Sequence, residues 1–329
     1  MSDKAKIIKF TETIVKIVIV LLGIWILYKK IIKNQNVTQV WNDIKISFTD
    51  KNQFILMIVA FLLVTVNILL EALKWKIQVK PIEDISLGKS YISIFTGMTA
   101  GMFFPNRMGN FLGRIFILEK GDRIKAAMVT IVGGFAQMIA TVCFGMIALL
   151  FFIEKNKLLI FFGIIIIISL LIIMYFKIYL LKYLQLFIPK RFKEKTKSYI
   201  EIFSQYNKKE LTEILIISFA RYLLYSFQFV ILIWAFNVPL SYINAMIPIS
   251  LTYLMMMIVP YITITEIAVR GSVSILIFEK WLMMNGINSS LSAMVFSASS
   301  LLWIFNIAIP AVIGLFLTNR LKFFRKNEL

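Results

Sequence analysis

Residues 158–176 read LLIFFGIIIIISLLIIMYF, nineteen positions without a charged side chain. At about 1.5 Å of rise per residue, a helix of this length covers roughly the 30 Å hydrocarbon core of a bilayer. Apolar runs of similar character recur at about 10–28, 54–73, 126–153, 211–236 and 291–318. The sequence therefore predicts an all-α fold, a polytopic bundle of about six to eight transmembrane helices.

The overall composition also indicates a protein that lies in a lipid bilayer. Apolar residues make up 60% of the 329 positions, against roughly 45–50% in soluble domains. The net charge of +19 is carried by short segments between the apolar runs, where Lys and Arg set topology and meet anionic lipids. No basic stripe is interleaved with stacking aromatic residues, so we expect no nucleic-acid partner. The first run is flanked by lysines and lacks a cleavage site, which predicts an uncleaved span.

Metal and cofactor chemistry finds little support in the sequence. The chain has no histidine, and its one cysteine, Cys143, lies inside an apolar run. The commonest zinc ligand and the commonest general base are therefore missing, and no disulfide framework is possible. We expect no metal and no cofactor.

Two further apolar regions, 90–118 and 243–280, are interrupted near their middles by Pro105 and Pro260. Proline removes a backbone donor and disfavours helix at the residue before it, and Gly109 beside the first break permits close backbone approach. These patterns predict two re-entrant hairpins that hinge at Pro105, Gly109 and Pro260. For 243–280, two short spans remain an equal alternative.

The distribution of positive charge decides how the first region is threaded. If 90–118 enters and leaves on one side, the nine Lys and Arg of 177–210 lie on the same side as the N-terminus. A single kinked crossing would place them outside, against the positive-inside bias. We therefore predict a hairpin, with the N-terminus and the C-terminus both in the cytoplasm and the protein in the cytoplasmic (inner or plasma) membrane.

With both regions as hairpins, the chain reads as two matching halves at about 54–187 and 211–320. Each half has a span, a hairpin and a span, and the hairpins enter from opposite sides. Inverted repeats with broken helices meeting near the midplane are a recurring transporter architecture. The polar segment 188–210 is predicted to be a cytoplasmic connector, within a single transmembrane domain that covers 1–329.

Both broken regions place a polar residue four positions before an arginine. Asn110 precedes Arg114, and Glu266 precedes Arg270, a spacing that puts both side chains on one helix face. Charges at bilayer depth cost at least about 2.5–3.5 kcal/mol and persist where they pair, line water or contact substrate. A self-satisfied Glu266–Arg270 ion pair is an equally good interpretation of that pair. Arg107 is a further candidate, or a residue that reaches the interface.

The span 211–236 carries its own polar stripe. Arg221 lies about ten residues in, and Tyr225 and Gln228 follow at spacings of four and seven on the same face. Snorkelling from this depth is difficult, so we predict that these residues face a cavity. Glu71 and Lys74 end an earlier span beside Trp75, which indicates anchoring at the membrane interface.

With these motifs in view, the chain resembles the transmembrane region of lysylphosphatidylglycerol synthetases and the wider flippase-like family around it, over about 50–320. The resemblance rests on Lys74-Trp75, on the run from Phe104 to Asn110 and on the run from Pro260 to Gly271. The family often has Gly-Glu where this chain has Gly109-Asn110. The chain ends at Leu329, so we expect no aminoacyl-transferring domain.

The resemblance implies lipid translocation without lipid synthesis. We expect a transporter rather than an enzyme, with membrane lipids as partners and an anionic head group bound by arginines. An intramembrane lipid- or polyprenyl-modifying enzyme and a non-catalytic membrane subunit of a lipid synthesis system are the alternatives. Protein partners and homo-oligomers stay open. The predicted substrate-binding residues are Arg107, Asn110, Arg114, Arg221, Tyr225, Gln228, Glu266 and Arg270.

Overall fold

The computed structural model describes residues 42, 45–104, 107–119, 122–180, 183, 197, 199–261, 265–287 and 291–317. Throughout this part the ordered elements are helices, which confirms the all-α prediction. Five are long and apolar enough to cross a membrane: α3 (Lys51–Val79), α6 (Arg123–Leu149), α7 (Lys157–Phe176), α9 (Lys208–Ala235) and the continuous run Ser292–Leu317. The predicted first span at about 10–28 and the predicted hinge Pro105 lie outside the described residues.

Polar side chains start the long helices at the positions where backbone donors have no partner. Asp50 accepts hydrogen bonds from the backbone N–H groups at positions 52 and 53, and Asp122 does the same at the start of α6. Asn207 and Glu210 form a reciprocal capping box at the start of α9. Because a capped first turn satisfies backbone donors that have no partner within the helix, these residues fix where the helices begin.

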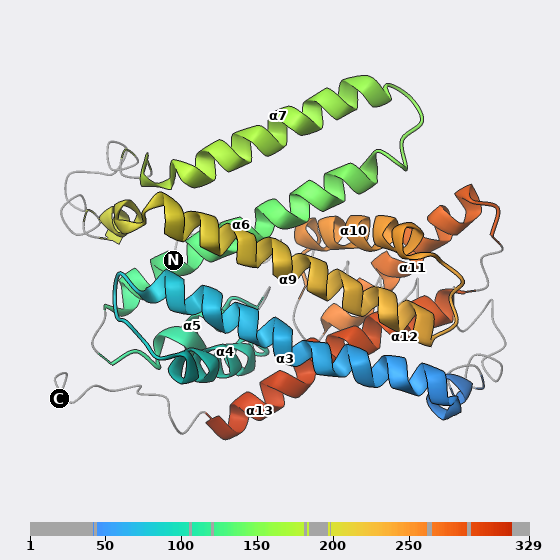
Figure 1. Cartoon of the computed structure of the whole chain (residues 1–329), viewed down its shortest axis with the longest axis horizontal. Helices are drawn as coiled ribbons and strands as arrows, with labels where there is room; N and C mark the ends of the chain where they lie inside the picture. The colour runs from blue at the N-terminus through green and yellow to red at the C-terminus, as the bar shows by residue number, and fades with distance from the viewer. Residues whose placement is uncertain are drawn as a thin grey trace, which may run out of the picture.

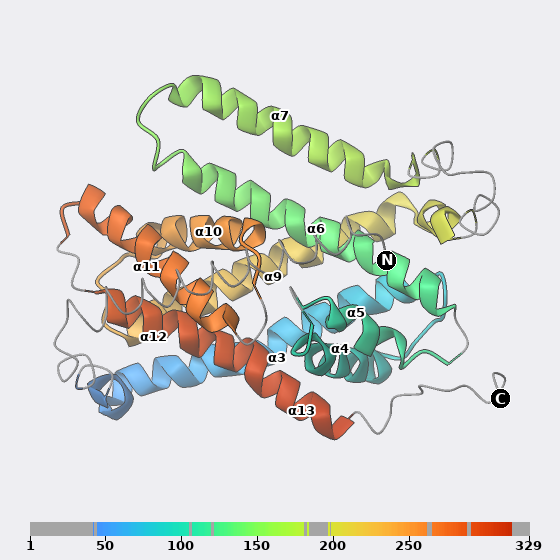
Figure 2. The same ribbon diagram turned by 180° about the vertical axis from the view of Figure 1, so that it is seen from behind.

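The long helices form one bundle with α3 and α9 packed along each other at its centre (Figures 1 and 2). α6 packs against α9 and against α10 (Tyr242–Ile258), while α7 stands at the edge and leans mainly on α6. Only 11% of the apolar window of α7 is buried. A helix that is apolar all round and so exposed fits a lipid-facing position.

The two broken regions form helical pairs near opposite ends of the bundle (Figure 1). The first pair is α4 (Leu87–Gly101) and α5 (Gly109–Ile115), and the second is α10 and α11 (Glu266–Met284). The chain before α4 meets the chain after α5: the Glu119 N–H donates to Glu83 Oε2 at 2.9 Å, and Lys89 Nζ lies 2.7 Å from Glu83 and 3.6 Å from Glu119. The first pair therefore starts and ends at one end of the bundle, as the charge argument requires. Its re-entry into a bilayer stays a prediction.

Glycine lets α4 and α5 touch through their backbones. A Cβ placed on Gly113 would collide with the Thr96 carbonyl oxygen and lie 2.6 Å from the Gly97 Cα. The Thr96 hydroxyl contacts the Gly113 carbonyl at 3.1 Å. A Cβ on Gly109, one of the predicted hinges, would collide with the Ala100 carbonyl oxygen. The small size of Gly109 thus serves close packing at the first turn of α5.

The second break follows the proline rule. α10 ends at Ile258, and Val259 has extended dihedral angles before Pro260. A proline disfavours helical geometry at the residue before it, which accounts for the end of the helix here. α11 then begins at Glu266. The structure gives a helix, a break and a helix, and leaves the choice between a hairpin and two short spans in the membrane as a prediction.

The last span contains a local irregularity. α12 (Ser292–Trp303) runs into a π-helical segment, η6 (Ile304–Ala308), which continues as α13 (Ile309–Leu317). α13 packs on α4, where the Thr99 hydroxyl donates to the Ala311 carbonyl at 2.6 Å. One extra residue per turn changes which side chains face the bundle interior.

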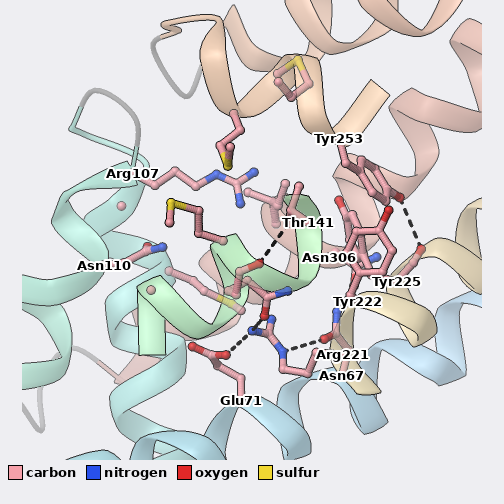
Figure 3. A pocket seen from close by; sticks show the side chains of 18 of the residues that line it. Asn67, Glu71, Arg107, Asn110, Thr141, Arg221, Tyr222, Tyr225, Tyr253 and Asn306 are labelled. Carbon is pink, nitrogen blue, oxygen red and sulfur yellow. Dashed lines mark hydrogen bonds and ion pairs between the residues drawn. The ribbon is translucent and has the colours of Figure 1, made fainter. Parts of the chain in front are cut away.

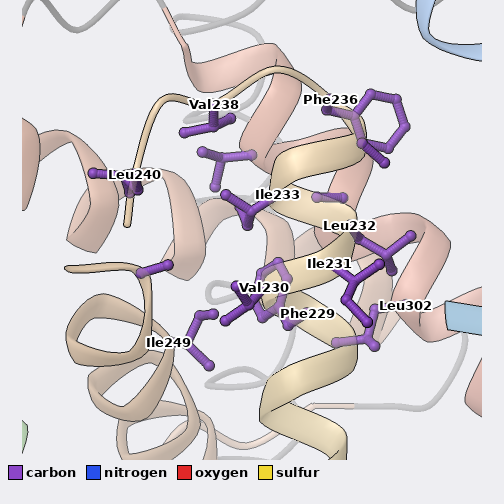
Figure 4. Close-up of a cluster of buried hydrophobic side chains, with 14 of the residues drawn as sticks. Phe229, Val230, Ile231, Leu232, Ile233, Phe236, Val238, Leu240, Ile249 and Leu302 are labelled. Atoms are coloured by element: carbon purple, nitrogen blue, oxygen red, sulfur yellow. The ribbon is translucent and has the colours of Figure 1, made fainter. Parts of the chain in front are cut away.

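One of the buried apolar clusters gathers around the second half of α9, and another joins α3, α6 and the first half of α9. Phe229, Val230 and Leu232 are buried in the first of these, with Ile249 from α10 and Leu302 from α12 (Figure 4). This packing holds α10, α11 and α12 against the central helix.

The predicted connector 188–210 is partly described: it contains the short helix η4 (Glu201–Gln205), and α9 already begins at Lys208. Tyr206 donates to the Gln78 carbonyl at the end of α3, and burial raises the pKa of this tyrosine above its usual value. A span, a broken pair and a span occur on each side of the connector, as an inverted repeat would give, but α7 has no counterpart among the described helices that follow it. The repeat itself stays a prediction.

Candidate functional site

A cavity of about 590 Å³ lies between the two broken regions and the central helices (Figure 3). Residues from α3, α4, α5, α6, α9, α10, α11 and the π-helical segment line it, so that distant parts of the chain meet there. Its polar and charged lining consists of Asn67, Glu71, Arg107, Asn110, Arg114, Gln137, Thr141, Arg221, Tyr222, Tyr225, Tyr253, Tyr261, Arg270 and Asn306.

One charged cluster is built on Glu71. Its Oε1 accepts from Arg114 Nη2 at 2.7 Å, and its Oε2 accepts from Lys74 Nζ at 2.8 Å and also pairs with Arg221 Nη1. The lysine lies one helical turn after Glu71 on α3, while the arginines come from α5 and α9. Three cations on one buried carboxylate leave an excess of positive charge, because Glu71 neutralises only one of them.

Amides extend this cluster. Arg221 Nε donates to Asn67 Oδ1 at 3.0 Å, and Asn67 in turn donates to Asn306 Oδ1 at 3.0 Å. Arg221 Nη1 also reaches Gln137 Oε1 at 3.3 Å. Asn306 lies in the π-helical segment, which turns this polar side chain into the bundle. The amides fix the position of the Arg221 guanidinium without neutralising it.

A second charged cluster is built on Glu266, which is fully buried. Arg107 binds it through two nitrogens, Nε to Oε2 at 2.9 Å and Nη2 to Oε1 at 2.7 Å. Arg270 Nη2 donates to Oε1 at 2.6 Å, and its Nη1 donates to the Tyr225 hydroxyl at 2.8 Å. Arg107 has a left-handed backbone with φ of 56°. The break of the first region is thus tied to the first turn of α11.

Tyrosines form another part of the wall. The Tyr253 ring lies 5.8 Å from Tyr222 and 5.4 Å from Tyr225, and the Arg270 guanidinium lies 5.9 Å from the Tyr225 ring centre. Figure 3 shows the three rings grouped on one side of the cavity, away from Glu71. Aromatic faces support cations and present hydroxyl groups, so this wall combines apolar surface with hydrogen-bonding capacity.

Six of the eight predicted substrate-binding residues line the cavity: Arg107, Asn110, Arg114, Arg221, Tyr225 and Arg270. Glu266 lies directly behind the lining, bound to Arg107 and Arg270. Gln228 lies elsewhere, buried, with its Nε2 donating to the Ala60 carbonyl at 3.0 Å. Although Gln228 shares a helix stripe with Arg221, seven residues place it about 10 Å further along the axis, beyond the cavity. Pro260, a predicted hinge, follows the end of α10 and directly precedes Tyr261, which lines the cavity.

The sequence interpretation of Glu71 and Lys74 as interfacial anchors differs from the structure. Both side chains are buried in the charged cluster. Asn67, Gln137 and Asn306 were also missed as site residues. The spacing of Asn67 and Glu71 by four positions on an otherwise apolar helix was the available signal, since it marks a polar stripe. Among the described residues, no group of three acidic or cysteine side chains could hold a metal ion.

The fold and the cavity define a polytopic helical membrane protein with a charged site among its transmembrane segments. The family model described as the lysylphosphatidylglycerol synthase TM region matches residues 13–301, and the chain belongs to this family. The predicted resemblance is thereby confirmed. A search of curated proteins and a search of solved structures each found no match.

Proposed function

We propose that the protein moves a lipid with an anionic head group across the cytoplasmic membrane. The observation that carries the proposal is the concentration of four arginines, Arg107, Arg114, Arg221 and Arg270, around one cavity among apolar helices. Guanidinium groups bind phosphate oxygens through planar pairs of donors. Because a buried cation is costly unless it is paired, an anionic ligand would stabilise the arrangement.

The surroundings of the cavity suit the rest of a lipid. Met257 lies in the lining near the end of α10 and keeps 46% of its surface exposed. Large apolar side chains are exposed at both breaks: Phe103, Phe104, Met108 and Ile258. A charged cavity with exposed apolar side chains on the neighbouring breaks suits a molecule that has a charged head and hydrocarbon tails.

The ion pairs suggest how such a site would open in turn to each leaflet. Arg107 on the first broken region holds Glu266 on the second, and Arg221 on α9 holds Glu71 on α3. An anionic head group competes with both carboxylates for the same arginines. Exchange of partners would loosen contacts between the two parts of the chain and favour a different relative position of the broken helices.

Reconstitution of the purified protein into liposomes with tail-labelled anionic lipid tests this function. We expect the wild type to accelerate movement of the label between leaflets and Arg114→Ala or Arg270→Ala to abolish the acceleration, with normal abundance in the membrane. Arg123→Ala is the matched control, since Arg123 stacks on Phe116 outside the cavity lining and should leave transport near the wild-type rate.

Two results would contradict the proposal. If the lipid recovered from the liposomes is chemically changed, the protein is an enzyme acting within the membrane. If the wild type is folded and moves no lipid, and the arginine variants lose only binding to other proteins, it is a non-catalytic subunit of a membrane assembly.

A further inference from the structure

The cavity carries more positive charge than its own carboxylates neutralise. Four arginines and one glutamate give the lining a formal net charge of +3. Lys74 and Glu266, which lie behind the lining and contact it, cancel each other and leave this excess unchanged. The uncharged partners, namely Asn67, Gln137 and Tyr225, orient the guanidiniums and supply no negative charge.

Two of the arginines also keep donors unused. Arg114 is 9% exposed and Arg270 is 7% exposed, and each has a buried Nε–H without a hydrogen-bond partner in the described part of the chain. Buried donors are seldom left unpaired. Arg114 Nε lies 3.5 Å from the place that a Cβ on Gly97 would take, so its N–H faces α4. A ligand with several acceptor oxygens, bound between Glu71 and Glu266, would pair these donors once the two guanidinium groups turn toward the cavity.

From the excess charge and the unused donors we infer that the head group carries its phosphate as a phosphomonoester or a diphosphate, with about two or more negative charges. This inference rests on the proposed function and names the class of lipid. A phosphomonoester offers three acceptor oxygens and about −1.5 to −2 charge at neutral pH. A phosphodiester offers one charge, and a zwitterionic head group adds a cation that the four arginines repel.

The test compares head groups on one lipid tail. Liposomes of phosphatidylcholine hold the wild-type protein and trace tail-labelled phosphatidic acid, phosphatidylglycerol or phosphatidylethanolamine. We expect phosphatidic acid to move about tenfold faster than phosphatidylglycerol or more, and phosphatidylethanolamine to move at the protein-free rate. Tenfold corresponds to about 1.4 kcal/mol, which is less than one extra charge contributes beside a guanidinium at an effective dielectric constant of about 20. Equal rates for phosphatidic acid and phosphatidylglycerol overturn the inference and leave the proposed function standing.

A charge variant tests the cause of the preference. Gln137→Glu has nearly the same shape as the wild type and places one negative charge beside Arg221, where the Gln137 Oε1 already accepts. The preference for phosphatidic acid over phosphatidylglycerol should fall by about threefold or more. Gln205→Glu makes the same change at an exposed position outside the cavity and should leave the preference intact. A preference unaltered in Gln137→Glu overturns the charge argument, and the wild-type comparison decides the matter if this variant fails to fold.

The same phosphate chemistry occurs in soluble molecules, so a separate measurement distinguishes the source. Liposomes containing the wild type are given radiolabelled glycerol 3-phosphate outside. We expect no uptake, because the proposed substrate also binds through its hydrocarbon tails, on exposed apolar side chains near the breaks such as Phe103, Met108 and Ile258. Uptake without movement of any lipid would overturn the proposed function of lipid transport, while it would support a phosphomonoester as the group that the arginines hold.

Discussion

At the scale of single residues, two buried glutamates organise the site. Each binds arginines that come from both sides of the connector: Glu71 holds Arg114 and Arg221, and Glu266 holds Arg270 and Arg107. A buried carboxylate that holds several cations is worth more to the fold than a surface ion pair, because its removal leaves those cations unpaired in a poorly solvated place. The glutamates therefore serve stability, and the arginines remain partly available to a ligand.

Replacement of Glu71 tests whether a buried carboxylate contributes more to stability than a surface ion pair does. Glu71→Gln leaves Arg114, Arg221 and Lys74 without their counter-ion, and we expect the free energy of unfolding to fall by about 3–5 kcal/mol. Thermal unfolding in detergent measures the loss. Lys80→Met breaks the more exposed pair of Lys80 with Glu210 at 3.7 Å and should cost at most about 1 kcal/mol. Similar losses in the two variants would show that Glu71 is well solvated.

The Glu266 cluster allows the stabilising and ligand-binding roles to be separated. Glu266→Leu should destabilise by about 3–5 kcal/mol, and adding Arg270→Met should restore only part of that loss, because Arg107 is still left without its partner. A triple variant with Arg107→Met should approach wild-type stability and move no lipid. Stability in detergent and lipid movement in liposomes report the two roles. A stable triple variant that transports at the normal rate would place the site around Arg114 and Arg221 alone.

The sequence could identify the arginines because charge is conspicuous in apolar segments, and six of the eight predicted residues do line the cavity. It could not identify Glu71 as their counter-ion. That contact joins α3 to α5 and α9, and no local spacing encodes a pairing between residues 71 and 221. The sequence could not predict that Asn306 lines the cavity, because a π-helical turn changes the helix face on which a side chain lies.

At the scale of elements, the spans were predictable from apolar length and the breaks from proline and glycine. Each predicted span within the described residues has a helix, although α3 extends to Val79, beyond the predicted end near 73. The polar residues at its end suggested an interface, whereas Glu71 and Lys74 are buried by packing with other helices. Packing against other helices therefore stabilises α3 beyond the end of its apolar stretch.

The contact of α4 with α5 depends on the absence of side chains at its centre. Gly113→Ala would push a methyl group into the Thr96 carbonyl and against the Gly97 Cα at 2.6 Å, and we expect a loss of about 1–3 kcal/mol from overpacking. Gly163→Ala on α7 is the matched control: nothing lies within 4 Å of a Cβ there, so the better helix propensity of alanine should leave stability equal or higher. Thermal unfolding of both variants decides, and an unaffected Gly113→Ala would mean that the two helices can separate.

At the scale of the whole molecule, the bundle has two ends that differ in charge. The end where α3 finishes and where α6 and α9 begin carries Lys80, Lys89, Lys125, Lys208 and Lys209 within the described residues. At the opposite end, where α3 and α7 begin and α11 ends, the described residues carry Lys45, Lys51, Lys155, Lys157 and Lys280. The first end also carries Arg123 and Lys177, so it keeps the larger number of positive residues. The positive-inside bias acts on short segments such as these, so the first end is predicted to face the cytoplasm.

Accessibility of single cysteines in cells tests this orientation and the threading of the first broken region together. In a Cys143→Ser background, Glu154→Cys lies at the opposite end from Glu119→Cys and Ser204→Cys, and all three positions are exposed. Membrane-impermeant maleimide should label only position 154 in intact cells and all three after permeabilisation. Glu119 and Ser204 must behave alike, because α6 and α7 lie between them and cross the bundle twice. External labelling of both would reverse the orientation of the molecule. External labelling of position 119 alone would contradict the arrangement of helices itself, and with it the convergence of the four arginines on one cavity.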